Sequence, residues 1–403
     1  MGVCTELGAA TVRPILANLR SDMKKSKTSS APSKSPLKAA VRKKTAAPRA
    51  PMHVAVIGGG MAGVVCARTL LQAGHQVTMI EKSRGFGGRM ATRSTEFGGF
   101  DHGAQYFTVR DKRFAQVLLT AQDQVKAWSV STVRVLDELG HVLASAPPPT
   151  EPHFVAIPGM SGLVTHWAQP LVQPERHNVK GAHTLLETRA TLLERDALNA
   201  EQWQLRAEDS EGGQHVYGGF DRVVLALPHL QAHDLLMASG HSPELRQQLN
   251  KVTVAPCWTL MVAYPNAMQP NLPHIGPQWN AARSTHHRIS WLARENSKPG
   301  RERIERWTVQ ASPTWSAKHL EDSDERVEAK LLKGFAEVTG IRATPAYAVV
   351  HRWRFAQTQT ALGQSHIFDK SLGIGLCGDW CLGHRVEDAF VSGLEMALAM
   401  AMV

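Results

Sequence analysis

Short apolar runs and a helical pattern alternate where the folded part of the chain begins. The run HVAVIG, which starts at His53, ends in glycines and predicts a buried strand. Apolar residues at helical spacing over 61–72 predict a helix, which Ala73 and Gly74 would end. The run QVTMIE, over 76–81, predicts a second buried strand. This strand–helix–strand order is typical of a parallel sheet covered by helices.

More strands of this sheet are predicted much later in the chain. Residues 220–228 (FDRVVLALP) and 373–380 (GIGLCGDW) are apolar runs bounded by Pro or Gly, and a helix is predicted from about 387 to 401. Between them, the alternating patterns PCWTLMVAY, RISWLA and RWTVQAS predict strands of a second, mostly antiparallel β-sheet. We therefore expect an α/β fold (α+β overall) with one sheet assembled from separated segments.

Positive charge is concentrated at the N-terminal end. Residues 1–50 carry +9 of the net charge of +10, because eleven Lys and Arg stand there against two acidic residues. The rest of the chain is close to neutral, so the overall charge indicates little about its partners. Residues 24–51 are rich in Lys, Ser, Ala and Pro and lack aromatic residues, which predicts a disordered tail.

Two interpretations of this tail remain open. In the first, the tail is a solvated extension without a specific role, or translation starts at Met52 and not at Met1. In the second, the tail contacts nucleic acid or an anionic surface, or it targets the protein to an organelle. We favour the first pair and expect no specific nucleic-acid partner. Five scattered cysteines favour a reducing compartment, so we expect a cytoplasmic protein, or an organellar one if residues 1–50 are a targeting peptide. No apolar stretch reaches the about 18 residues that a membrane span needs, and the oligomeric state stays unknown.

A glycine motif joins the first predicted strand to the first predicted helix. The run GGGMAG over 58–63 has the spacing G-x-G-x-x-G. In this motif Gly58 permits a tight turn, Gly60 lets the backbone approach a pyrophosphate, and Gly63 lets helix and strand pack closely. Glu81 ends the second predicted strand, where a carboxylate accepts hydrogen bonds from ribose hydroxyls. In this context the motif predicts a Rossmann-like dinucleotide-binding domain.

A second glycine motif, GFGGRMATR over 85–93, follows directly. It resembles flavoproteins of the amine-oxidase type, in which paired glycines and an Arg lie along the pyrophosphate and ribityl chain. Arg89 suits that place because a planar guanidinium pairs with phosphate oxygens in a bidentate manner. The next segment, DHGAQYF over 101–107, reaches the isoalloxazine ring in that group. Gln105, Tyr106 and Phe107 are therefore candidates for the flavin face or substrate cavity, with ordinary core packing as the alternative for Tyr106 and Phe107.

The last motif, CGDWCLGHRVEDA, covers 377–389. We expect the strand to end at Gly378 and Asp379, where a carboxylate can bind hydroxyls on the ribityl or phosphate side of the cofactor. A helix starting near Val386 would direct its N-terminal dipole at the flavin edge on which negative charge develops during reduction.

The same segment offers an alternative reading as a metal site, formed by Cys377, Cys381 and His384. Structural metal sites in proteins combine four such ligands, and no second ligand pair follows at a useful spacing. We therefore predict no metal.

Together these segments resemble the renalase-like branch of the FAD-dependent amine-oxidase superfamily. The resemblance runs from about His53 to the C-terminus; the superfamily shares the glycine motifs, and the segments with KPGR, HRW and GDW narrow the resemblance to this branch. Ala190 stands where relatives often have a Val that binds adenine through its backbone. The predicted contacts to noncovalent FAD are Gly58, Gly60, Met61, Ala62, Gly63, Glu81, Lys82, Gly87, Gly88, Arg89, Ala190, Gly378, Asp379, Val386 and Glu387.

The resemblance also implies how the chain is divided. A disordered basic tail covers 1–51, and a Rossmann-like FAD-binding domain alternates with a substrate domain. We assign 52–107, 156–235 and 346–403 to the FAD-binding domain and 108–155 and 236–345 to the substrate domain.

The implied activity is that of an FAD-dependent oxidoreductase, an oxidase or dehydrogenase. A small-molecule substrate would pass a hydride to flavin N5, and oxygen or another acceptor would reoxidise the flavin; renalase-type enzymes are associated with dihydronicotinamide isomers. Gln105, Tyr106 and Trp353 are the candidate catalytic residues. The lysine that many amine oxidases keep near N5 has no match that we can place.

Two alternatives of function stay open. The first is an amine or polyamine oxidase, or a desaturase, of the same superfamily. The second is a non-enzymatic flavin-bearing protein that docks through its basic tail, which would lose binding steeply with added salt.

We predict that deletion of residues 1–50 leaves FAD binding and turnover intact, because the first predicted strand begins at His53 and the tail lacks the apolar residues of a packed segment. The melting temperature and flavin content of the truncated and full-length proteins would be compared. Loss of flavin on truncation would contradict this boundary.

Overall fold

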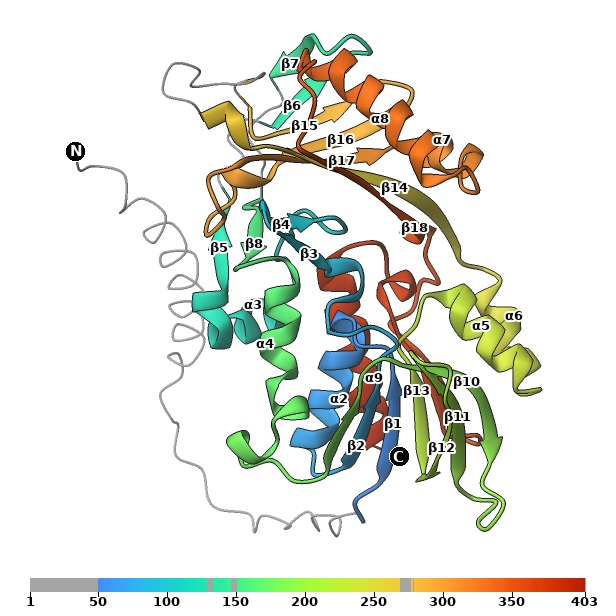
Figure 1. Ribbon diagram of the computed structural model, residues 1–403. Helices are drawn as coiled ribbons and strands as arrows, with labels where there is room; N and C mark the ends of the chain where they lie inside the picture. The colour runs from blue at the N-terminus through green and yellow to red at the C-terminus, as the bar shows by residue number, and fades with distance from the viewer. Residues whose placement is uncertain (1–49, 129–132, 146–150, 269–276, 278, 403) are drawn as a thin grey trace, which may run out of the picture.

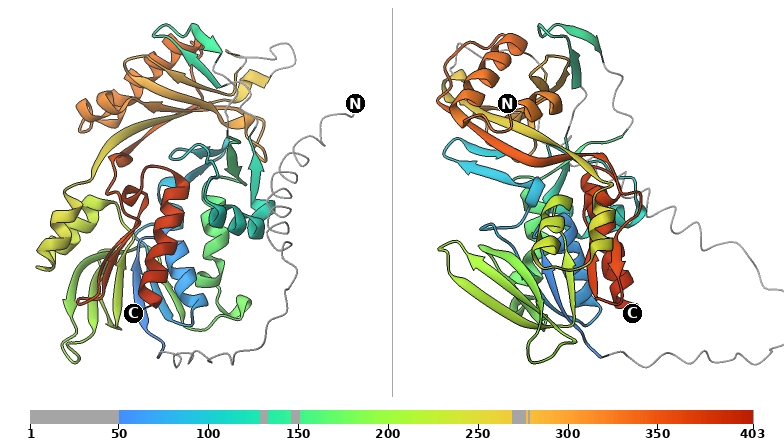
Figure 2. Two further views of the ribbon diagram at one scale, coloured as in Figure 1. Left: turned by 180° about the vertical axis from the view of Figure 1, so that it is seen from behind. Right: turned by 90° about the vertical axis from the view of Figure 1, so that its right-hand side faces the viewer.

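The computed structural model describes residues 50–128, 133–145, 151–268, 277 and 279–402, and the predicted tail lies outside them except for its last two residues (Figure 1). Two layered units are visible: a parallel sheet with its helices in the lower part of Figure 1, and a second sheet above it. Figure 2 shows the same two-part arrangement from behind and from the side.

The lower unit is built on a six-stranded sheet of order β19-β20-β13-β1-β2-β9. All neighbouring strands run parallel except the edge pair β19 and β20. The strands are short and almost wholly apolar because helices or a further sheet cover both faces. Their bounds are β1 His53–Ile57, β2 Gln76–Ile80, β9 Ala182–Leu185, β13 Arg222–Leu225, β19 Ile367–Asp369 and β20 Ile374–Leu376.

Three helices pack into one core on the first face of this sheet: α2 (Met61–Gln72), α4 (Ser161–Val172) and α9 (Val386–Ala401). A Cβ added at Gly393 of α9 would lie 2.2 Å from the carbonyl oxygen of Ala62, so only glycine permits this approach of α9 to α2. The other face is covered by a three-stranded antiparallel sheet and two helices, namely β10 Thr188–Arg195, β11 Trp203–Asp209, β12 Gln214–Phe220, α5 His229–Ala238 and α6 Pro243–Leu249.

The upper unit is a seven-stranded sheet of order β18-β14-β17-β16-β15-β6-β7. Every neighbouring pair is antiparallel except β15 with β6. Helix α8 (Asp324–Thr339) packs its apolar side on this sheet, where Phe335 meets Trp307 and Tyr264. The strand bounds are β6 Val133–Leu136, β7 Val142–Ser145, β14 Thr253–Tyr264, β15 Ala281–Ser284, β16 Ile289–Arg294, β17 Glu305–Ala311 and β18 Tyr347–Thr360; the short helix α7 covers Pro313–Lys318.

The predicted fold class is confirmed: a Rossmann-like parallel sheet is combined with a mostly antiparallel second sheet. Three local features differ from the predictions. The run 220–228 is divided, because β12 ends at Phe220 and β13 begins at Arg222 in another sheet. The run 373–380 is a strand only over β20, and residues Asp379–Cys381 form a 3-10 turn. Strand β18 pairs with β14 in the second sheet, although 346–403 was assigned to the FAD-binding domain.

The segment 108–155 also departs from its assignment to the substrate domain. Helix α3 (Lys112–Leu118) buries Phe114 against Phe390 of α9 and Trp167 of α4, in the core of the lower unit. Only β6 and β7 of this segment join the second sheet, while β5 (Val125–Ala127) pairs with β8 (Phe154–Ala156).

Among the described residues we find no helix with the length and apolar content that a bilayer crossing requires.

A buried group of charges joins the two units at Asp101, the last residue of β4 (Gly98–Asp101), which pairs with β3 (Thr92–Thr95). One carboxylate oxygen of Asp101 accepts from Lys298 Nζ at 3.0 Å and Arg301 Nη2 at 2.7 Å, both from the loop between β16 and β17. The other accepts from Thr92 Oγ1 at 2.7 Å and from the Met160 amide at 2.8 Å, at the start of α4. Burial alone would raise the pKa of Asp101, but Lys298 and Arg301 outweigh it and hold this pKa well below its usual range.

We predict that Asp101→Ala lowers the free energy of unfolding by about 3–5 kcal/mol, because it leaves the buried Arg301 without its carboxylate and takes from Lys298 one of its two. Urea unfolding at pH 7 would measure the loss. The control is Asp322→Ala in the upper unit. It removes a carboxylate that pairs with His319 and Lys330 nearer the surface, and it should cost far less. An equal loss in both variants would contradict the role given to Asp101.

Candidate active site

A cavity of about 1630 Å³ lies between the carboxyl ends of β1, β13 and β20 and the inner face of the second sheet. Its lining runs from Gly58 and Met61 at the first glycine motif to Trp291, Gln310 and Trp353 of the upper unit. Ligands of open parallel sheets bind outside the carboxyl ends of the strands, which is where this cavity opens. It exceeds the about 300–1,000 Å³ of usual small-molecule pockets, so it has room for a dinucleotide together with a smaller ligand.

The three glycines of the first motif serve different purposes. Gly58 has a positive φ of 111°, and a Cβ there would lie 2.4 Å from the Ala226 carbonyl oxygen. A Cβ on Gly63 would lie 1.9 Å from the Gly58 carbonyl oxygen, so both positions are explained by protein packing. A Cβ on Gly60 would meet nothing closer than 4.0 Å and would project at the cavity wall. Gly60 therefore leaves free space beside the backbone, as the approach of a pyrophosphate requires.

The second glycine motif packs against the first. The Gly87 amide donates to the Gly59 carbonyl oxygen at 3.0 Å, and Gly87 and Gly88 have positive φ values of 141° and 54°. A Cβ on Gly88 would lie 3.2 Å from Gly60 Cα. The two motifs thus form one cradle whose backbone faces the cavity.

Glu81 follows β2 and is held at the edge of this cradle. Its two carboxylate oxygens accept from the Gly59 amide at 2.5 Å and the Ser83 amide at 2.8 Å. A carboxylate oxygen can accept two hydrogen bonds and each here accepts one from an amide, so both keep capacity for ribose hydroxyls on the cavity side. The protein contacts orient the carboxylate without exhausting it.

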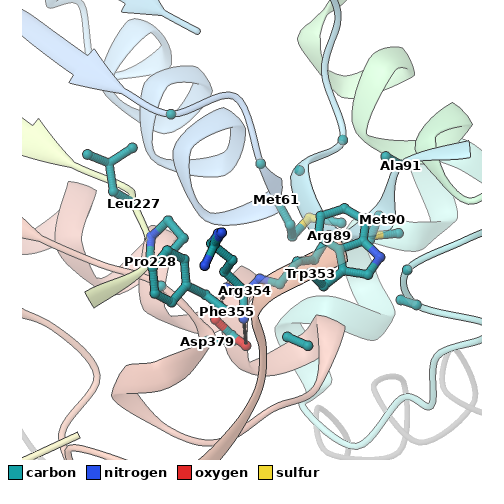
Figure 3. Close-up of a pocket in the computed structure, with 18 of the residues that line it drawn as sticks. Met61, Arg89, Met90, Ala91, Leu227, Pro228, Trp353, Arg354, Phe355 and Asp379 are labelled. Atoms are coloured by element: carbon teal, nitrogen blue, oxygen red, sulfur yellow. Dashed lines mark hydrogen bonds and ion pairs between the residues drawn. The ribbon is translucent and has the colours of Figure 1, made fainter. Parts of the chain in front are cut away.

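Arg89 and Asp379 line the cavity and form a bidentate ion pair, which is drawn with dashed lines in Figure 3. Arg89 Nη1 donates to Asp379 Oδ2 at 2.8 Å, and Nη2 donates to Oδ1. The sequence predicted that Arg89 contacts phosphate and Asp379 contacts hydroxyls. Their mutual pairing holds both at the same wall and leaves the remaining donors of Arg89 for a ligand.

Helix α9 begins at the cavity. Val386 lines it, and the Arg385 amide at the N-cap donates to Asp388 Oδ2 at 2.9 Å, which leaves other amides of the first turn and the helix dipole for a ligand. Glu387 points elsewhere, because its carboxylate accepts from the amides of Arg110 and Asp111 at 2.6 and 2.5 Å. The Glu387 side chain does not line the cavity, so the expected FAD contact would rest on its backbone amide in the first turn of α9.

The donor set fits FAD. A glycine cradle with free space at Gly60, a carboxylate at the end of β2 and a helix N-terminus meet in one cavity at the places that pyrophosphate, ribose and flavin would need. Of the predicted FAD contacts, only Gly63 and Glu387 lie outside the lining.

The upper end of the cavity has a wall of aromatic and imidazole rings. Trp353, on β18, stacks on His102 with ring centroids 5.2 Å apart, and His351 contacts both rings. The indole Nε1 of Trp353 donates to the His102 carbonyl oxygen at 2.8 Å, which fixes the ring. Burial, His351 and Arg93 lower the pKa of His102 to about 3, and burial and Arg93 lower the pKa of His351 to about 4. Both imidazoles are therefore neutral near pH 7.

The other two candidate catalytic residues line the same cavity but differ in their freedom. Tyr106 stacks on His153 with centroids 4.1 Å apart and lies near Trp291. The Gln105 side chain is engaged by protein groups: its Oε1 accepts from Lys298 Nζ at 3.2 Å, and its Nε2 donates to carbonyl oxygens of Asp101 and Gly103. Gln105 is thus placed to shape the wall rather than to offer its amide.

Sequence reasoning missed several residues around the cavity. His351 and Arg93 lie within segments that were noted only for their resemblance, and Lys298 lies in the KPGR segment. Lys298 is buried behind Gln105 and does not line the cavity. Cys377 and Cys381 are buried and only His384 lines the cavity; among the described residues no cluster of three potential ligands could hold a metal.

Sequence comparison agrees with this geometry. The profile of the "Flavin containing amine oxidoreductase" family matches residues 148–401, which is more than half of the chain. This chain belongs to the flavin-containing amine oxidoreductase family. A profile described as "NAD(P)-binding Rossmann-like domain" matches residues 56–119, which hold both glycine motifs. The family is one of flavin-containing oxidoreductases, which agrees with the fit of the cavity to FAD.

Similar solved structures share the fold of this family member. A putative protoporphyrinogen oxidase from Exiguobacterium sp. 255-15 has a TM-score of 0.64 at 13% identity, covering 88% of this chain and 99% of that one. Cyclohexylamine oxidase from Brevibacterium oxydans IH-35A has a TM-score of 0.61 at 14% identity, with the same coverage.

Curated relatives match over a short stretch only. An L-amino-acid oxidase from Notechis scutatus scutatus is 48% identical over 50 residues, 12% of this chain and 10% of that protein. A putative L-amino-acid oxidase from Bacillus subtilis is 42% identical over 57 residues, 14% of this chain and 12% of that protein. The match thus spans about a tenth of the length of these relatives.

We predict that Glu81→Ala weakens FAD binding about tenfold to a hundredfold, since hydrogen bonds to a charged group are worth about 1.5–3 kcal/mol. Titration of the FAD-depleted protein would give the dissociation constant. Glu96→Ala, an exposed carboxylate between β3 and β4, is the control. Equal affinity in wild type and Glu81→Ala would remove Glu81 from the cofactor site.

Proposed function

We propose that this protein is a renalase-like oxidase that takes a hydride from a small planar donor bearing negative charge, with dihydronicotinamide isomers as the candidate substrates. Oxygen or another acceptor would receive the electrons. The renalase-like branch is supported by the KPGR, HRW and GDW segments in the sequence. The substrate class is supported by the charge of the cavity.

The charged lining of the cavity is mainly cationic. Its carboxylates are Glu81, Asp379 and Asp234, of which the first two are bound by backbone amides and by Arg89. Its cations are Lys82, Arg84, Arg89, Arg93, Arg189, Arg283, Arg352, Arg354 and Arg385. Such a field attracts anions and opposes the entry of ammonium groups. This is the observation that carries the proposal.

The residues of this chain would act by binding and orientation. Trp353 and the neutral His102 stack on each other and the neutral His351 stands edge-on to both, so that together they offer aromatic surface to a planar ring in the cavity. Tyr106, braced by His153, adds a second aromatic surface. A substrate held between a ring wall and the cradle would have its reacting carbon positioned for transfer, which is the main contribution that a protein makes to this chemistry.

FAD, when bound, supplies the acceptor for the hydride. The N-terminus of α9 lines the same cavity, so its dipole and free amides would stabilise negative charge that develops there. A dihydronicotinamide donor needs no base, because loss of the hydride alone yields the aromatic product. An amine would first need to lose its ammonium proton, for which the neutral His102 and His351 are candidate acceptors on the wall.

Amine oxidation is the second candidate function, and membership of the amine-oxidoreductase family favours it. The amine class would bring a cation into a cavity with nine cationic side chains. A polyamine, with several ammonium groups, fits this lining least well.

We predict that anaerobic mixing of the FAD-containing protein with dihydronicotinamide isomers bleaches the flavin absorbance, whereas an equal concentration of monoamines or polyamines does not. Stopped-flow absorbance would give the reduction rate for each compound. Common NADH and NADPH serve as controls for donors with the same charge but the usual ring isomer. Faster bleaching by amines than by any dihydronicotinamide would overturn the proposal in favour of an amine oxidase.

A further inference from the structure

Arg93 is a cation on the cavity wall for which the described residues provide no carboxylate partner. It lies on β3, where successive side chains point to opposite faces. Its neighbour Thr92 faces Asp101 in the buried charge group, so Arg93 is directed to the other side. By contrast, Arg89 of the same cavity pairs with Asp379, and Arg354 pairs with Glu321.

Carboxylates act near Arg93 only at a distance: among the described residues none forms an ion pair with it, although Asp324 is close enough to His351 to raise the pKa of that imidazole. His351 and His102 are near enough for the guanidinium to lower the pKa of both imidazoles, so they stay neutral beside it. The nearby carboxylate of Asp101 is fully buried and is bound by Lys298 and Arg301. Since Arg93 is only partly buried and borders the cavity, a ligand can reach it from the cavity.

Geometry also relates Arg93 to the ring wall. His351 lies 4.5 Å from Trp353 and 4.7 Å from His102, measured between ring centroids. Arg93 and the three rings line the same cavity, so a planar ligand held against these rings lies in the space that Arg93 borders. The guanidinium is planar and always charged, and it binds carboxylate or phosphate oxygens through paired hydrogen bonds.

We propose that Arg93, together with the ring wall of His351, His102 and Trp353, forms a subsite for an oxyanion, a carboxylate or phosphate, attached to a planar ring. The subsite specifies the substrate class of the proposed function and rests on that function, because it requires that this cavity is the substrate site. It makes Arg93 a specificity-determining residue that selects anionic over neutral and cationic ring compounds.

The test uses the oxidised, FAD-containing protein and ligands that are not substrates. Benzoate, phenyl phosphate, benzamide and benzamidinium are titrated while the visible absorbance of the flavin reports binding. We expect benzoate or phenyl phosphate to bind at least about tenfold more tightly than benzamide, since charge-assisted hydrogen bonds to an anion are the strong ones. The comparison of the affinities for benzoate and phenyl phosphate shows whether the subsite prefers a carboxylate or a phosphate.

Two variants assign the effect to Arg93. Arg93→Met should weaken anion binding about tenfold to a hundredfold and leave benzamide within about twofold, and Arg93→Lys should restore part of the affinity. Arg206→Met, which removes an Arg paired with Glu194 on β11 outside the cavity, is the control and should bind as wild type does.

Equal binding of benzoate, phenyl phosphate and benzamide to the wild type would overturn the subsite, and so would unchanged anion affinity in Arg93→Met. If Arg93→Met loses FAD, the wild-type comparison and Arg93→Lys decide the question. Flavin bleaching by dihydronicotinamides is a separate measurement. Failure of that reaction with intact anion selectivity would reject the proposed function alone, and the reverse outcome would reject the subsite alone.

Discussion

The buried carboxylate of Asp101 is the constraint on which the arrangement of the two units depends. It binds Lys298 and Arg301 from the upper unit and Thr92 and the Met160 amide from the lower one. The residues that follow Asp101 are held from the same upper sheet. Gln310 donates to the Gly103 carbonyl oxygen at 2.7 Å, Trp353 donates to that of His102, and Lys298 reaches Gln105. The cavity wall therefore keeps its shape only while the two units keep their relative position.

Charge is divided between two environments in this protein. In the buried group, Lys298 and Arg301 meet Asp101, while Glu295 shares Lys298; burial raises the pKa of Glu295, with Asp101 adding to the rise and Lys298 opposing it. In the cavity, cations exceed carboxylates and several face the solvent-filled space. The first arrangement satisfies charges within the protein, and the second leaves charge available to a ligand.

The sequence allowed accurate prediction where structure is local. The bounds of β1, α2 and β2 follow from short apolar runs and glycine stops, and the fold class follows from their order. Long-range contacts limited the rest. Strand β18 carries His351, Arg352 and Arg354 to the cavity. It belongs to the second sheet because it pairs with β14, which lies almost a hundred residues earlier, and such a distant pairing leaves no local pattern. Glu387 was expected at the cofactor, but the amides of Arg110 and Asp111 bind it, and no local pattern reveals that partner.

The strand order of the parallel sheet also bears on how the protein is made. Strand β1 pairs with β13, and β13 pairs with β20, so the sheet is complete only when residues 374–376 have been synthesised. Asp379 and helix α9 come later still. Domains that fold as contiguous units can form during synthesis, but here the first glycine motif packs against Ala226, which follows β13, and β13 in turn waits for β20. The nascent chain thus leaves the hydrogen-bonding edge of β13 without its partner strand until residues 374–376 have been made, so this side of the sheet forms late in synthesis.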